Sequence, residues 1–174
     1  MLTHLTQAGT IHTVLAMLCI AIGGIQLLRP KGGAVHRALG YAYVYAMILA
    51  DGAVMLIYRF TGQFNLFHVG ALVNFACIVL AMVPVLRSPR PAGWRLHHYY
   101  WIAWSYVGLL AAAATELIAR TSQLATRGQI WVLSALMTML VTVVGSFLIR
   151  RNRPPSPPRP AAESTGVQHE GAPS

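Results

Sequence analysis

Four histidines lie near the ends of long apolar stretches, where imidazoles could bind a metal. Each lies near the start of its stretch, so in an up-and-down bundle His12 and His68, from the first and third stretches, fall at one end. His36 and His98, from the second and fourth stretches, fall at the opposite end. In an antiparallel four-helix bundle, the first helix faces the third across the diagonal and the second faces the fourth. Neighbouring axes are 8–10 Å apart, so diagonal axes are roughly 11–14 Å apart. The pattern predicts two b-type haems, one held by His12 and His68 and one by His36 and His98.

Two carboxylates near His12 and His68 offer a different chemistry. Asp51 in the second stretch and Glu116 in the fourth lie in the same half as His12 and His68. A mixed set of imidazoles and carboxylates binds zinc or iron. An open coordination position on that metal would support metal-dependent hydrolysis. The alternative hypothesis is therefore a zinc or iron site formed by these four side chains, in the outer leaflet of a membrane.

Each carboxylate also has a simpler explanation. Asp51 could hydrogen-bond to a neighbouring helix, for instance to Asn74, and Glu116 could pair with Arg120 one helical turn later. Ionisable groups at membrane depth also serve in proton relays, which would make the chain a small carrier. A third possibility is a non-catalytic membrane scaffold whose histidines only anchor the helix ends.

Five apolar stretches must position these side chains. The chain has 174 residues, of which 56% are hydrophobic and 10% charged, whereas soluble domains contain about 25% charged residues. A helix needs about 20 apolar residues to cross the hydrocarbon core. The stretches that meet this requirement are residues 7–28, 36–58, 66–86, 98–119 and 129–149. We therefore expect an all-α integral membrane helical bundle with five transmembrane helices in residues 1–150, in contact with the lipid bilayer.

The distribution of positive charge predicts the orientation of the bundle. Ten of the thirteen Lys and Arg residues fall on one side: Arg29, Lys31, Arg37, Arg87, Arg90, Arg95, Arg150, Arg151, Arg153 and Arg159. Positively charged loops stay cytoplasmic, so the N-terminus is predicted outside and the C-terminus inside, in a bacterial inner membrane. Residues 151–174 are rich in proline and are expected to form a disordered cytoplasmic tail.

The same composition excludes other classes of protein. The basic residues occur in short clusters without a basic face, so we expect no nucleic acid partner. The only cysteines, Cys19 and Cys77, provide no disulfide framework. A redox partner or a membrane-complex subunit is compatible with the haem hypothesis, but no motif identifies one.

Short motifs surround the four histidines. His36 lies within PKGGAVHRALGYAY, Phe67 precedes His68, and His98 begins HYYWIAWSY. On these motifs, residues 10–120 resemble the bacterial family of predicted membrane proteins known as domain of unknown function 2306. The resemblance implies a membrane location and the four histidine positions, but no activity. Helical phase leaves open whether His97 or His98 points inward, and the family spacing favours His98. Tyr99 and Ile102 stand where family members usually carry a basic residue and a methionine.

Overall fold

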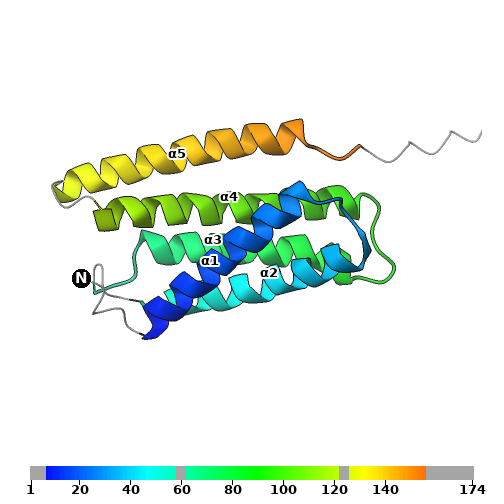
Figure 1. Ribbon diagram of the computed structural model, residues 1–174, viewed down its shortest axis with the longest axis horizontal. Helices are drawn as coiled ribbons and strands as arrows, with labels where there is room; N and C mark the ends of the chain where they lie inside the picture. Colours follow the sequence, from blue (N-terminus) through cyan, green and yellow to red (C-terminus); the bar gives the residue numbers. More distant parts are fainter. Residues whose placement is uncertain (1–6, 58–61, 122–125, 156–174) are drawn as a thin grey trace, which may run out of the picture.

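The computed structural model describes residues 7–57, 62–121 and 126–155, and long helices account for nearly all of this backbone. The helices are α1 (Gln7–Leu28), α2 (Gly33–Val54), α3 (Leu66–Leu86), α4 (Trp94–Thr121) and α5 (Arg127–Arg151) (Figure 1). The described residues contain no strand. The all-α prediction is confirmed for this part of the chain.

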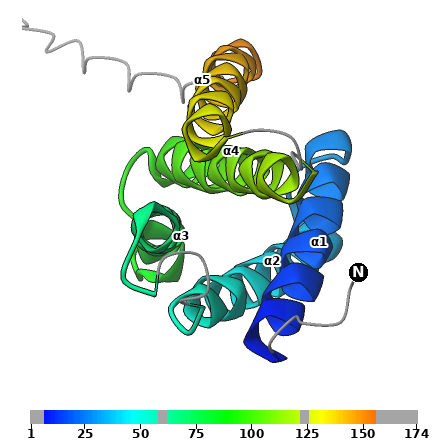
Figure 2. The same cartoon turned by 90° about the vertical axis from the view of Figure 1, so that its left-hand side faces the viewer.

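The first four helices form a ring. α1 packs against α2 and α4, and α3 packs against the same two helices from the opposite side. α5 lies outside the ring and packs along α4 (Figure 2). α1 therefore faces α3 across one diagonal and α2 faces α4 across the other, which confirms the predicted order.

The predicted bounds are correct for α1 and α3 but need correction for the other helices. α2 begins at Gly33 rather than residue 36, and α4 begins at Trp94 rather than residue 98. Both helices follow a turn made by a glycine with positive φ, Gly32 (93°) and Gly93 (73°). A glycine adopts this conformation without steric cost, so each helix starts at once after the turn.

The far ends of these helices also differ from the prediction. α2 ends at Val54 rather than residue 58, because the Met55 N–H bonds to the Gly52 carbonyl oxygen at 3.2 Å in a tightened last turn. α4 continues to Thr121, and α5 extends from Arg127 to Arg151 rather than from 129 to 149. Residues 156–174 of the predicted tail lie outside the described residues, as do His4 and His169.

In the part of the chain that the structure describes, four helices are long and apolar enough to cross a membrane: α1, α3, α4 and α5. α2 does not reach the same hydropathy, because it carries His36, Arg37, Asp51 and three tyrosines. Its role as a fifth span stays a prediction. Large apolar side chains are exposed along α1, α3 and α5, including Met17, Leu72 and Phe147. So much exposed apolar surface is typical of helices that contact lipid.

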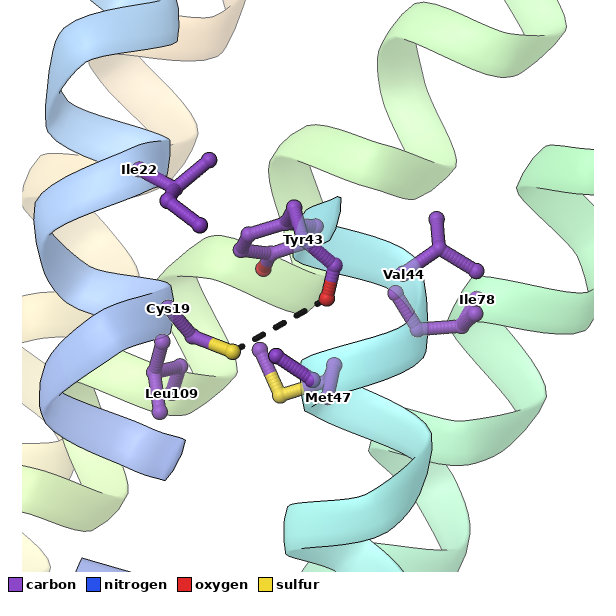
Figure 3. Packing of buried hydrophobic residues seen from close by; sticks show 8 residues of the cluster. Cys19, Ile22, Tyr43, Val44, Met47, Ile78 and Leu109 are labelled. Atoms are coloured by element: carbon purple, nitrogen blue, oxygen red, sulfur yellow. Dashed lines mark hydrogen bonds between the residues drawn. The ribbon is translucent and has the colours of Figure 1, made fainter. Parts of the chain in front are cut away.

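Side chains from all four ring helices fill the middle of the ring. The central cluster consists of Cys19, Ile22, Tyr43, Val44, Ala46, Met47, Ile78 and Leu109 (Figure 3). Met47 and Ile78 are each 1% exposed, and Cys19 is fully buried. This cluster separates two ends of the ring. We call them the His12 end, where α1 and α3 begin and α2 and α4 end, and the His36 end, where α2 and α4 begin and α1 and α3 end.

Candidate functional site

Two histidines on diagonally opposed helices lie at the His36 end. His36 lies in the first turn of α2, and its Nδ1 is 3.1 Å from the Gln26 side-chain oxygen on α1. Gln26 Nε2 in turn donates to the His36 carbonyl oxygen at 3.0 Å. His98 lies in the second turn of α4, and its Nδ1 is 3.0 Å from the Ala81 carbonyl oxygen on α3. The two imidazoles thus lie at the same end of the bundle, one on α2 and one on α4.

These contacts fix where each ring carries its proton. An amide or carbonyl oxygen can only accept a hydrogen bond, so Nδ1 is the donor in both His36 and His98. In a neutral imidazole, Nε2 then keeps its lone pair. Histidines that bind metals usually donate their other ring N–H to an oxygen in this way. Both side chains at the His36 end therefore have the tautomer of a metal ligand.

A pocket of about 240 Å³ lies beside His36. It is lined by the first turn of α2 and the preceding turn, together with Gln26, Arg29 and Pro30. Gln26 thus contacts the His36 ring and also faces this pocket. The half-buried His36 side chain is accessible to a ligand from the end of the bundle.

His97 differs from its neighbour in exposure. Its Nε2 donates to the Leu80 carbonyl oxygen at 3.1 Å, one residue before the acceptor of His98. His97 is exposed, whereas His98 is half-buried. The structure thus places His98 closer to the interior of the ring, as the family spacing suggests.

At the His12 end, His12 connects three helices. Its Nδ1 donates to the Ala50 carbonyl oxygen on α2 at 3.1 Å, and its Nε2 lies 4.0 Å from Glu116 Oε2 on α4. The described part of the chain does not include the Arg120 side chain, so the predicted pair between Glu116 and Arg120 stays a prediction. The structure instead brings Glu116 to a histidine.

His68 has a structural role at the start of α3. It is 1% exposed, and its Nδ1 accepts the Asn65 backbone N–H at 3.2 Å in a capping box. An accepting Nδ1 carries no proton, so Nε2 carries it in the neutral ring. Binding iron through Nε2 would require the proton to move to Nδ1 and the cap to break. The present arrangement at the His12 end therefore does not fit a haem held by His12 and His68, and that pair stays a prediction.

Asp51 pairs with Asn74, as the simpler explanation of this carboxylate predicts. Asn74 Nδ2 donates to Asp51 Oδ2 at 3.0 Å and to Oδ1 at 3.4 Å, and both residues are 9% exposed. Within the described ranges, no three His, Cys, Asp or Glu side chains come together in a group able to hold a metal. Of the four side chains of the predicted zinc or iron site, only His12 and Glu116 contact each other, whereas His68 bonds to Asn65 and Asp51 to Asn74.

Three contacts were not anticipated from the sequence. One is the pair of hydrogen bonds between Gln26 and His36. The only sign of it in the sequence is that Gln26 is a polar residue within an apolar stretch. Another lies in the middle of the ring, where Tyr43 donates to Ser105 Oγ at 3.0 Å and Ser105 donates to the Ile102 carbonyl oxygen at 2.8 Å. Tyr43 and Ser105 thus join the diagonal helices α2 and α4 directly.

The third contact joins α1 to α4. The Tyr106 ring lies against Gly23, and its hydroxyl donates to the Ile20 carbonyl oxygen at 3.1 Å. Tyr43, Ser105 and Tyr106 all belong to the motifs that carry the family resemblance. Their contacts give these motif positions a packing role between the two ends.

Comparison with known proteins identifies the family and leaves the activity open. Residues 9–151 match the family model described as "Predicted membrane protein (DUF2306)". The match extends beyond residue 120 and includes all of α5. Neither a curated protein nor a solved structure matches the chain. The chain is a multi-pass membrane protein that belongs to this family of predicted membrane proteins.

Proposed function

We propose that this protein carries electrons in the membrane through a b-type haem held by His36 and His98. The observation that carries the proposal is the pair of imidazoles at one end of the ring, each with Nδ1 bonded to an oxygen and Nε2 left with a lone pair. Bound between two imidazoles, a haem iron supplies one-electron transfer.

The surrounding residues hold the two imidazoles in the state needed for this role. Gln26 holds His36 by two hydrogen bonds, one to the ring and one to the backbone. The Ala81 carbonyl oxygen holds His98. Such partners fix the tautomer and raise the basicity of the ligating nitrogen. The buried cluster and the Tyr43–Ser105 pair fill the middle of the helix ring.

The proposal concerns one haem, at the His36 end. A second haem on His12 and His68 would require His68 to give up the cap of α3. The proposal includes five membrane crossings in a bacterial inner membrane, with the His36 end cytoplasmic. The clusters of basic residues beside α1, α2, α3 and α4 at that end support this orientation.

The decisive measurement is a reduced-minus-oxidised visible spectrum of the full chain, purified from haem-replete cells. We expect the bands of a bis-histidine b-type haem and about one haem per chain. His36→Gln and His98→Gln should each abolish the bands. His97→Gln is the matched control, because the same exchange is made at the adjacent residue, and it should keep them. A colourless protein, or bands that survive both ligand variants, would overturn the proposal.

A further inference from the structure

Asp51 is a buried carboxylate that the proposed haem site does not use. It lies on α2 at the His12 end and is 9% exposed. Asn74 on α3 donates to both of its oxygens. No described basic side chain forms an ion pair with Asp51. An ionised carboxylate has about four acceptor sites and is costly to bury without a charged partner.

The remaining polar atom of Asn74 is the second observation. Asn74 Oδ1 is buried and has no hydrogen-bond partner among the described residues. This oxygen faces Gly108 on α4. A Cβ added at Gly108 would lie 3.4 Å from Asn74 Oδ1 and would meet no other neighbouring atom within 4 Å. Asn74 thus lies between the Asp51 carboxylate and α4, with an acceptor that lacks a donor.

We propose that Asp51 and Asn74 form a proton-binding site at the His12 end of the ring. A proton on Asp51 removes the buried charge and creates an O–H donor. After a half-turn of the Asn74 amide, that donor can bond to Oδ1, the acceptor that has none while Asp51 is ionised. One proton therefore removes the buried charge and gives Oδ1 a donor, while the Asn74 N–H groups turn from Asp51 toward α4. A metal cation is a poorer occupant, because Asn74 presents its amide nitrogen to Asp51.

The groups around Asp51 are compatible with proton binding. The titratable side chains within electrostatic reach are Cys19 on α1, Tyr43 on α2 and Cys77 on α3, which are neutral near neutral pH. His12 and Glu116 lie on the more exposed side. Their side chains are 20% and 33% exposed, and His12 bonds to the carbonyl oxygen of the residue preceding Asp51. They form the edge through which a proton would enter from water.

The test is infrared difference spectroscopy of the full chain in lipid nanodiscs as the pH is changed. The sequence has only four carboxylic side chains: Asp51, Glu116, Glu163 and Glu170. At about pH 6, roughly two units above the ordinary aspartic acid pKa of about 3.9, we expect the C=O band of a protonated carboxyl, which should shift in D2O. Asp51→Asn should remove the band. Asn74→Leu should move its titration to higher pH, because the ionised form loses its amide donor.

Matched variants identify the source of the band. Glu163→Gln combined with Glu170→Gln should leave it unchanged. If the Asp51→Asn protein does not fold, a hydrophobic carbodiimide decides the question in the wild type, because this reagent modifies protonated carboxyls. Mass spectrometry should then find the adduct on Asp51. No band at about pH 6, a band that Asp51→Asn retains, or an adduct on Glu116 alone would overturn the proposal. The measurement needs no haem, so its outcome is independent of the proposed electron transfer.

Discussion

A single methyl group at position 23 should separate α1 from α4. A Cβ at Gly23 would overlap Cε2 and Cδ2 of the Tyr106 ring and lie 3.2 Å from Cζ. The ring cannot simply turn away, because its hydroxyl donates to the Ile20 carbonyl oxygen at 3.1 Å. Gly23→Ala therefore forces either the helices apart or the hydrogen bond to break.

The magnitude follows from these two costs. Overpacking a well-packed interface costs about 1–3 kcal/mol, and losing the Tyr106 hydrogen bond costs about 0.5–1.5 kcal/mol. Alanine also favours the helix over glycine by about 1 kcal/mol. Gly24→Ala gains the same helix propensity, but its Cβ would lie 3.5 Å from the Tyr106 hydroxyl, an ordinary contact. Because either cost relieves the overlap, the free energy of unfolding of Gly23→Ala should be about 1–3 kcal/mol lower than that of Gly24→Ala.

The assay is reversible unfolding in mixed micelles of dodecyl maltoside and SDS, followed by far-ultraviolet circular dichroism. Comparing adjacent alanine variants cancels helix propensity and most effects on the unfolded state. Gly23→Ala should also weaken haem binding, because Gln26 lies almost one turn further along α1 and holds His36. Equal stability of the two variants would refute the packing of Tyr106 on Gly23.

Other contacts give further predictions. Gln26→Leu removes both hydrogen bonds to His36 and should weaken haem binding about 10–100-fold in a haem titration. Gln26→Glu keeps an acceptor for the His36 imidazole and should bind haem more tightly than Gln26→Leu. Equal affinities of the two variants would contradict a role of Gln26 in holding His36. Tyr43→Phe removes the bond to Ser105 and should lower the free energy of unfolding by about 1 kcal/mol; wild-type stability would contradict the contact. Gly145→Ala would place a Cβ 2.8 Å from Val107 Cγ1 and should cost about 1–3 kcal/mol. The control is Gly128→Ala on the same helix, where a Cβ meets nothing within 4 Å, and no difference between the two would argue against close packing of α5 on α4.

The helices and their order could be predicted because both depend on local properties of the chain. The length of the apolar stretches locates all five helices, and a short turn such as residues 29–32 makes α1 and α2 antiparallel neighbours. The starts of α2 and α4 lie earlier than predicted, directly after Gly32 and Gly93. A positive φ at each glycine completes the turn in fewer residues.

The candidate site was less predictable, because its histidine partners are mostly backbone atoms. The Ala81 and Ala50 carbonyl oxygens that bond to His98 and His12 leave no trace in residue types. His68 did carry a local signal, since it follows Asn65 by three residues, the spacing of a capping box. Glu or Gln is usual at that position, so a histidine there does not match the common form of the motif.

The two ends of the ring therefore differ in chemistry although their histidines are arranged alike in the sequence. At the His36 end, oxygen acceptors hold Nδ1 of both rings and leave both Nε2 lone pairs. At the His12 end, the Nδ1 of His68 accepts a backbone N–H, and Nε2 of His12 lies 4.0 Å from Oε2 of the Glu116 carboxylate. The tautomer, set by the neighbouring donor or acceptor, decides whether a histidine can bind a metal. The His36 end is suited to binding a haem iron, and the His12 end, with the buried carboxylate of Asp51, is suited to binding a proton.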